Sequence, residues 1–244
     1  MKSRMMTAAM GCLLAGNCLA GTIIVGTEAT FAPFEFKDTK TEEITGFDID
    51  VIKAIAKMNG DTVVVRNMGF DALIPSLMTK QIDVAAAAIS ITPERLQRVS
   101  FTQPYYNSSV VILIRQADKN KIVDLKSLEN KRICAQIGTT GAELATSVKG
   151  SVVTQFNSVV EAYMELKNLG CEAVLNDQQV VENYLKDGHD KSVVMLSQRY
   201  EPSVYGFAVK KDNEAMLDKL NRGLHQLRQS GEYDRIHQKW FGQL

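Results

Sequence analysis

Short apolar runs and helical stripes alternate along the first half of the chain. Strands are expected at residues 23–25 and in the run of small apolar residues that ends at Ser90, and residues 62–65 read as a buried strand. Helices are expected between them, one at residues 70–77 and one with Asp48 as its N-cap. One face of the latter helix is lined, at helical spacing, by Ile52, Ile55, Ala56 and Asn59. Strand, helix, strand, helix, strand is the order of a parallel sheet with crossover helices.

The same order repeats in the second half. Strands are expected at residues 131–136, 152–156 and 172–175, and helices after Gly141, after Ser158 and at residues 178–186. The helix that Ser158 caps has an apolar stripe formed by Val159, Ala162, Tyr163 and Leu166. Two successive units of this kind predict two α/β lobes with a cleft between them.

Two further segments connect these units. Residues 110–114 and 205–209 read as extended strands, so we expect the chain to cross between the lobes twice. Residues 213–240 are expected to be helical, interrupted at Gly231, and to return to the first lobe. One face of this helical part is formed by Leu217, Leu220, Leu224 and Leu227.

The first twenty residues differ from the rest. Lys2 and Arg4 precede an apolar stretch that ends in small residues at Ala20, which is the layout of a secretory signal peptide. We expect residues 1–20 to be removed and the protein to be exported to the periplasm. Cys12 or Cys18 could instead carry a lipid anchor, although neither follows a convincing lipidation box.

Composition and cysteine count narrow the class further. The 28 basic and 28 acidic residues balance, so nothing indicates a nucleic acid as a partner. After the signal peptide only Cys134 and Cys171 remain. Two cysteines in an exported protein could pair, but both lie in segments that read as buried strands. We favour two unpaired core thiols, and no cysteine spacing indicates a metal site.

Arg95 raises the question of a bound ligand. Thr92 is a suitable N-cap and Pro93 a suitable first residue of a helix, so Arg95 lies in the first turn. A cation gains nothing from the helix dipole there. Arg95 is therefore either a surface arginine paired with a nearby acid or a residue that binds a carboxylate.

Polar residues at the carboxyl ends of the predicted strands favour the second interpretation, because ligands of open α/β sheets bind at these ends. The residues are Glu28, Ser90, Gln136, Thr139, Thr140 and Asp177. Arg95 and the free amides at Thr139 and Thr140 could hold a carboxylate. Asp177 and the Ser90 hydroxyl could hold an ammonium group. Together they predict a clamp for a zwitterion, which is an α-amino acid.

Several motifs occur in an order that resembles the polar amino acid-binding proteins of ABC importers, which are solute-binding proteins of family 3. They are Gly-Thr-Glu-Ala-Thr-Phe-Ala-Pro-Phe at 26–34, Gly-Phe-Asp-Ile-Asp at 46–50, Phe-Asp-Ala-Leu-Ile-Pro-Ser-Leu at 70–77, Ser-Ile-Thr-Pro-Glu-Arg at 90–95, Phe-Thr-Gln-Pro-Tyr-Tyr at 101–106, Gly-Glu-Tyr at 231–233 and Lys-Trp-Phe-Gly at 239–242. The similarity covers essentially all of the chain after residue 20.

The resemblance implies a fold and a set of ligand contacts. The fold is the type II periplasmic binding protein fold, with lobe 1 at residues 21–106 and 206–244, lobe 2 at 107–205, and a two-strand hinge near 105–109 and 201–205. Arg95 and the Thr140 amide would take the α-carboxylate, and Ser90, the Ala88 carbonyl and Asp177 the α-ammonium. The ligand side chain would be surrounded by Glu28, Phe31, Phe70, Ala87 and Gln136.

Glu28 bears on which amino acid is bound. Glutamine-binding relatives also have an acid here but tend to pair it with a lysine, where this chain has Gln136. An uncompensated carboxylate beside Phe31 and Phe70 favours a cationic ligand side chain, with cation–π attraction of about 0.5–2 kcal/mol. We therefore expect arginine, lysine or ornithine, with glutamine as the alternative.

Two other classes of protein are considered. Some relatives are dehydratases, but none of the three histidines adjoins a strand-end motif, and no nucleophile elbow or phosphate loop occurs. A sensor module would be expected to continue into a signalling domain. We expect a monomeric carrier without cofactor that delivers its ligand to a membrane permease.

Overall fold

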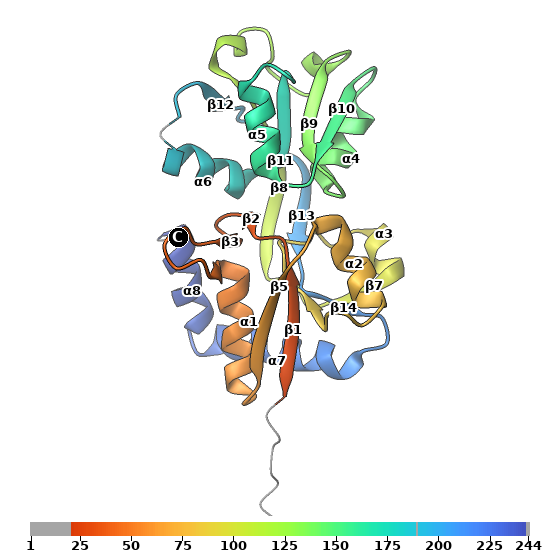
Figure 1. Cartoon of the computed structure of the whole chain (residues 1–244), viewed down its shortest axis with the longest axis vertical. Coiled ribbons are helices and arrows are strands. Elements are labelled where there is room, and N and C mark those ends of the chain that lie inside the picture. Colours follow the sequence, from red (N-terminus) through yellow and green to blue (C-terminus); the bar gives the residue numbers. More distant parts are fainter. Residues whose placement is uncertain (1–20, 189, 243–244) are drawn as a thin grey trace, which may run out of the picture.

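The structure is a computed structural model that describes residues 21–188 and 190–242. It consists of two lobes, one above the other, with two strands running between them (Figure 1). The expected signal peptide and its cysteines, Cys12 and Cys18, lie outside the described residues. Within the described residues, no helix is both long enough and apolar enough to cross a bilayer.

The first lobe is built around a five-stranded sheet. In spatial order its strands are β5 (Thr62–Asn67), β1 (Thr22–Thr27), β6 (Val84–Ala85), β14 (Ala208–Lys210) and β7 (Val99–Phe101). A small separate sheet contains β2 (Thr30–Phe31), β3 (Glu35–Lys37) and β4 (Ile44–Thr45). The helices of this lobe are α1 (Phe47–Met58), α2 (Phe70–Met78), α3 (Pro93–Arg98), α7 (Glu214–Gln229) and α8 (Glu232–Phe241).

The second lobe contains a six-stranded sheet. Its strands are β10 (Val152–Phe156), β9 (Arg132–Gln136), β11 (Ala173–Asp177), β8 (Tyr106–Arg115) and β12 (Val193–Met195), with β13 (Tyr200–Tyr205) also paired to β8. Its helices are α4 (Thr140–Ser147), α5 (Val159–Lys167) and α6 (Gln178–Gly188), with 3-10 turns at Gln116–Asp118 and Lys126–Leu128.

The two sheets share one parallel arrangement. In the first lobe β1 pairs in parallel with both β5 and β6, and in the second lobe β9 pairs in parallel with both β10 and β11. Of the three parallel strands in each lobe, the one that comes first in sequence is therefore the central one. This confirms the predicted repeat of two strand–helix units. It also makes the carboxyl ends of β1 and β9 the points where the chain order reverses, which are the usual ligand sites of such sheets.

Strands β8 and β13 connect the lobes. They pair antiparallel, with Tyr106 opposite Tyr205 and Asn107 opposite Val204 (Figure 1). This ribbon lies where the hinge was expected and supports the division into residues 21–106 with 206–244 and residues 107–205. We retain these boundaries as a proposal.

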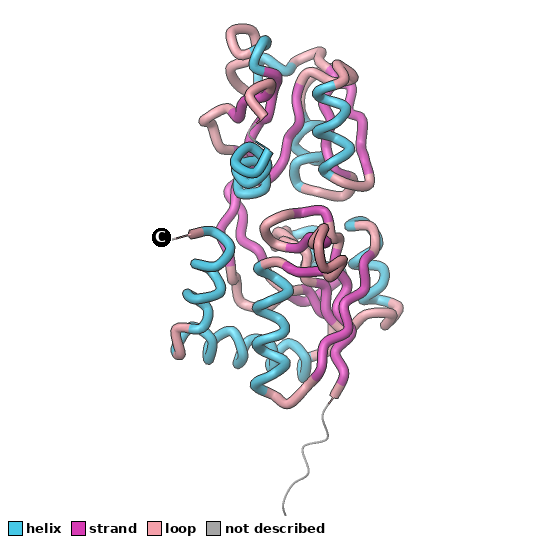
Figure 2. The backbone as a smooth tube through the Cα atoms, turned by 60° about the vertical axis from the view of Figure 1, so that its left-hand side comes forward, coloured by secondary structure: helices cyan, strands magenta, loops and turns pink. Residues whose placement is uncertain are grey.

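The C-terminal helices pack against α1 in the first lobe. Gly223 of α7 lies so close to Ile55 that a Cβ at position 223 would lie 2.5 Å from the Ile55 Cγ2 atom, so only glycine allows this approach. Of the four leucines predicted on one face, Leu220, Leu224 and Leu227 are buried, and Leu217 is partly buried and packs against the same core. Gly231 has φ of 73° and separates α7 from α8, which ends beside the junction of the lobes (Figure 2).

Three local predictions for the first lobe are wrong. The strand at residues 62–65 is not buried, because β5 is the edge strand of its sheet. Asn59 does not line a face of α1, because it is the exposed C-cap residue that follows the helix. Asp48 is not the N-cap of α1, because Gly46 occupies that position and Asp48 is fully buried in the first turn.

The prediction of unpaired thiols is also wrong, because Cys134 and Cys171 form a disulfide. β9 and β11 are neighbours, with Val174 opposite Cys134, and Cys171 lies shortly before β11. The two Cα atoms are 6.0 Å apart, within the range of disulfides. Hydrophobic pattern identified both segments as buried but did not reveal that they are adjacent.

Candidate functional site

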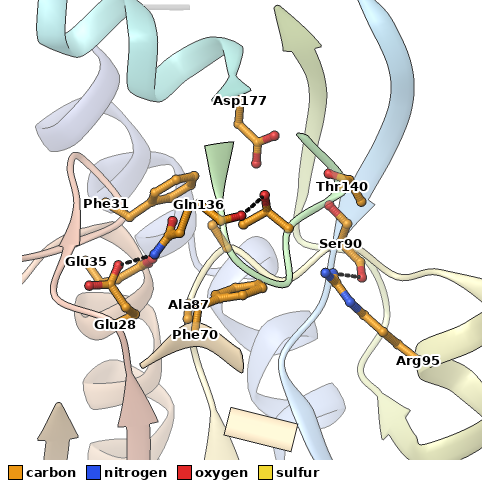
Figure 3. A pocket seen from close by; sticks show the side chains of 12 residues that line it. Glu28, Phe31, Glu35, Phe70, Ala87, Ser90, Arg95, Gln136, Thr140 and Asp177 are labelled. Atoms are coloured by element: carbon orange, nitrogen blue, oxygen red, sulfur yellow. Dashed lines mark hydrogen bonds between the residues drawn. The ribbon is translucent and has the colours of Figure 1, made fainter. Parts of the chain in front are cut away.

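A pocket lies between the lobes at the carboxyl ends of their parallel strands (Figure 3). It contains about 290 Å³ of space between the protein atoms, part of it open to solvent. All eleven residues predicted from the sequence line it, together with one that was not predicted, Glu35. The twelve are Glu28, Phe31, Glu35, Phe70, Ala87, Ala88, Ser90, Arg95, Gln136, Thr139, Thr140 and Asp177.

Arg95 is held at one end of this pocket. Thr92 caps α3 by accepting a hydrogen bond from the Arg95 N–H, as predicted. The Arg95 side chain is 7% exposed and donates to the carbonyls of Ser90, at 2.8 Å, and Gly138, at 2.9 Å. Its guanidinium also lies 5.4 Å from the centre of the Phe70 ring. Burial lowers the pKa of Arg95, although Glu143 and Asp177 act in the opposite direction. Arg95 is therefore a buried cation of the pocket and not a surface charge.

The start of α4 faces the same pocket from the second lobe. Thr139 is the N-cap, accepts a hydrogen bond from the Ala142 N–H at 3.2 Å, and donates to the Gln136 carbonyl at 2.7 Å. The first N–H groups of a helix have no partner within the helix. At Thr140 they are positioned to bind an anion.

Asp177 is the pocket acid that contacts the connecting ribbon. It is 7% exposed at the end of β11, and the Tyr205 hydroxyl donates a hydrogen bond to its Oδ2. Burial raises the pKa of Asp177 to about 6, while Tyr205 and Arg95 act to lower it. Tyr205 belongs to β13, so the connecting ribbon itself positions this carboxyl group.

Ser90 and Ala88 complete the same part of the pocket. Ala88 has a positive φ of 46°, and its N–H donates to the Asp48 Oδ2 at 2.9 Å. The Tyr105 hydroxyl donates to that same oxygen at 2.6 Å. The Ser90 Oγ lies 3.3 Å from the Ser203 Oγ. Asp48 thus fixes the backbone beside the pocket, a role that the sequence analysis missed.

Glu28 occupies the end of the pocket away from Arg95 (Figure 3). Its Oε2 accepts hydrogen bonds from Gln136 Nε2 at 2.9 Å and from Thr30 Oγ1 at 2.8 Å. The Gln136 Nε2 also donates a hydrogen bond to the Asn157 carbonyl, at 3.1 Å. Burial raises the pKa of Glu28, and the hydrogen bonds from Gln136 and Thr30 partly offset this. Because Glu28 follows β1 and Gln136 ends β9, the two reversal points of the sheets meet here.

Glu35 is the pocket residue that sequence reasoning missed. It lies on β3 and not at the carboxyl end of a parallel strand, which is the position that identified the other polar residues of the pocket. The one available signal was a glutamate between Phe34 and Phe36 in a short hairpin. It is 1% exposed, and its Oε2 has no hydrogen-bond partner among the described residues.

The site offers a cation and helix amides at one end and carboxyl groups elsewhere. Such an arrangement suits a small molecule that carries both signs of charge. The described residues hold no cluster of three or more histidine, cysteine, aspartate and glutamate side chains that could bind a metal ion.

Comparison with known proteins identifies the family. The bacterial extracellular solute-binding proteins of family 3 match residues 23–243. The chain is 35% identical to the ABC transporter arginine-binding protein 1 of Escherichia coli (strain K12), with all of both proteins covered.

Solved structures resemble the chain at a similar level of sequence identity. An ancestral arginine-binding protein, solved once with arginine and once with glutamine, is 38% identical with a TM-score of 0.85. The arginine complex covers 91% of this chain and 99% of its own, and the glutamine complex 92% and 100%. The ancestral amino acid-binding protein AncCDT-1, described as a precursor of cyclohexadienyl dehydratase, is 34% identical with a TM-score of 0.84, covering 91% and 96%. The chain belongs to the bacterial extracellular solute-binding proteins of family 3 and has their two-lobed, type II periplasmic binding protein fold.

Proposed function

We propose that this protein binds a basic L-amino acid in the pocket between its lobes and delivers it to the permease of an ABC importer. L-Arginine is the first choice, followed by lysine and ornithine. The observation that carries this proposal is the charge layout of the pocket, with Arg95 at one end, Glu28 at the other and Asp177 between the lobes. An arginine zwitterion carries the complementary charges in its carboxylate, its guanidinium and its ammonium group.

The proposed contacts assign each part of the ligand to named groups. Arg95 and the Thr140 amide, at the helix start capped by Thr139, hold the α-carboxylate through charge-assisted hydrogen bonds. Asp177, the Ser90 hydroxyl and the Ala88 carbonyl hold the α-ammonium group. The remaining predicted residues surround the ligand side chain, and they are Glu28, Phe31, Phe70, Ala87 and Gln136.

Glu28 and Gln136 support a basic ligand over glutamine. Gln136 supplies a neutral N–H to Glu28, so the hydrogen bond at 2.9 Å leaves the negative charge of Glu28 uncompensated. A ligand cation would provide that compensation, whereas the neutral amide of glutamine would not. The ancestral relative solved with either ligand keeps glutamine as the alternative.

Closure of the lobes is the proposed mechanism of capture. Arg95 belongs to the first lobe and Asp177 to the second, so only the closed arrangement satisfies both ends of the ligand and binding shifts the population toward it. The β8–β13 ribbon is the proposed hinge. We expect a monomer that works in the periplasm and binds no nucleic acid.

We infer binding and not catalysis at this site. Neither His225 nor His237 lines the pocket, and His189 lies outside the described residues. Glu28 and Asp177 could serve as an acid and a base, but the amino-acid clamp accounts for both. Incubation with prephenate or arogenate, followed by product analysis, would detect a dehydratase, and we expect no turnover.

Calorimetry tests the proposal. The protein is unfolded and refolded to remove carried-over ligand, then titrated with L-arginine, L-lysine, L-ornithine and L-glutamine. We expect the basic amino acids to bind more tightly than glutamine. Sub-micromolar binding of glutamine without binding of arginine would overturn the assignment.

A further inference from the structure

Two carboxyl groups lie at the end of the pocket proposed to hold the ligand side chain. Glu28 and Glu35 both line the pocket there, at 6% and 1% exposure (Figure 3). Two buried carboxylates that share a site do not both ionise readily, because each disfavours the charge of the other. One of the pair therefore tends to hold a proton until a cation compensates the second charge.

The hydrogen bonds decide which of the two is ionised. Glu28 accepts from the Gln136 amide and from the Thr30 hydroxyl, and such bonds favour the carboxylate form. The Oε2 of Glu35 has no partner among the described residues, so nothing there stabilises a charge on that atom. The different surroundings of the two groups therefore place the proton on Glu35.

The groups that face Glu35 reinforce this assignment. The charges that act on it are Glu28 from the β1–β2 turn, Asp48 from α1 and Asp177 from β11, and Tyr105 and Tyr205 lie near it at the hinge. Burial first, and then these three acids, raise the pKa of Glu35 well above its ordinary value. Glu35 forms no salt bridge within the described part of the chain. Arg95 lines the same pocket, but its guanidinium donates to the carbonyls of Ser90 and Gly138.

We propose that Glu35 carries a proton in the ligand-free protein and releases it to solvent when the cationic side chain of a basic amino acid binds beside Glu28. The O–H bond of the carboxylic acid breaks, the proton passes to buffer, and the new carboxylate pairs with the guanidinium or ammonium group. A neutral side chain would leave Glu35 protonated, so this residue favours cationic ligands. This inference rests on the proposed function of the pocket.

Proton release can be measured without a variant. The wild type is titrated calorimetrically with L-arginine in buffers of different ionisation enthalpy. The slope of the observed binding enthalpy against the ionisation enthalpy of the buffer gives the number of protons released. Across about pH 6.5 to 8.5, where Asp177 is mostly ionised, we expect a maximum of about one proton and an affinity that rises with pH by at most about tenfold per unit. Binding of L-arginine with no proton released at any pH in this range would overturn the proposal.

Variants identify the source of the proton. Glu35→Gln keeps the shape and hydrogen-bonding capacity of the protonated side chain but has no proton to release. We expect it to bind L-arginine more weakly, with a slope near zero and little dependence on pH. The matched control is Glu43→Gln, because Glu43 is exposed and lies outside the pocket, and it should keep the wild-type slope.

The outcomes separate this inference from the proposed function. If the wild type and Glu35→Gln release the same number of protons, another group such as Asp48 is the source and the assignment to Glu35 is wrong. If no basic amino acid binds the wild type, the proposed function itself fails. Binding of L-arginine without proton release would contradict only the role of Glu35.

Discussion

Replacement of Arg95 by alanine removes the cation that is proposed to hold the ligand carboxylate. Arg95 is 7% exposed, and its guanidinium donates to the carbonyls of Ser90 in its own lobe and of Gly138 in the other lobe. Loss of one member of a buried charge pair costs about 2–5 kcal/mol of binding free energy. At about 1.4 kcal/mol per tenfold, the Kd for L-arginine should rise from roughly thirtyfold to several thousandfold.

Calorimetry on Arg95→Ala measures this loss, with circular dichroism to establish that the variant folds. Arg98→Ala is the matched control, because Arg98 lies on the same short helix but is exposed and does not line the ligand pocket. It should bind as the wild type does. The assignment of Arg95 would be refuted if Arg95→Ala bound ligand within a few-fold of the wild type.

Three further predictions concern the acids and the disulfide. Glu28→Gln should lower the calorimetric affinity for L-arginine far more than that for L-glutamine, because it removes the charge proposed to select a cation. Equal losses of affinity for the two ligands would contradict this. Burial raises the pKa of Asp48 to about 7, from about 3.9 when unfolded, so urea titrations should show the free energy of unfolding falling by about 3–4 kcal/mol as pH rises from about 4 to above 7. Asp48→Asn should flatten the dependence of the free energy of unfolding on pH. An unchanged dependence in this variant would show that the Asp48 carboxyl is not its source. Replacing both Cys134 and Cys171 by serine should cost about 4 kcal/mol for a separation of 37 residues, and an unchanged urea midpoint would show that the bond contributes nothing.

The sequence revealed the pocket because its chemistry follows from topology. Glu28, Gln136 and Asp177 lie where parallel strands end, and hydrophobic pattern is sufficient to find those ends. The arginine of α3 could be placed through its N-cap, since Thr92 and Pro93 mark the first turn by local rules. The resemblance to a family supplied the aromatic and small residues of the pocket.

The rest depended on contacts between distant segments. The disulfide requires the knowledge that β9 and β11 are neighbours, and the exposure of β5 requires the strand order of its sheet. Asp48 looks like a helix cap in sequence, and its bonds to Ala88 and Tyr105 exist only once the lobe is assembled. Glu35 was missed for the same reason, because a glutamate in a polar hairpin is normally exposed.

A structure of the refolded protein with L-arginine tests the central claim most directly. The account predicts the α-carboxylate on Arg95 and the start of α4, the α-ammonium group on Asp177, and the guanidinium between Phe31 and Phe70 against Glu28. A ligand bound in the reverse direction, or a guanidinium that does not contact Glu28, would contradict the account.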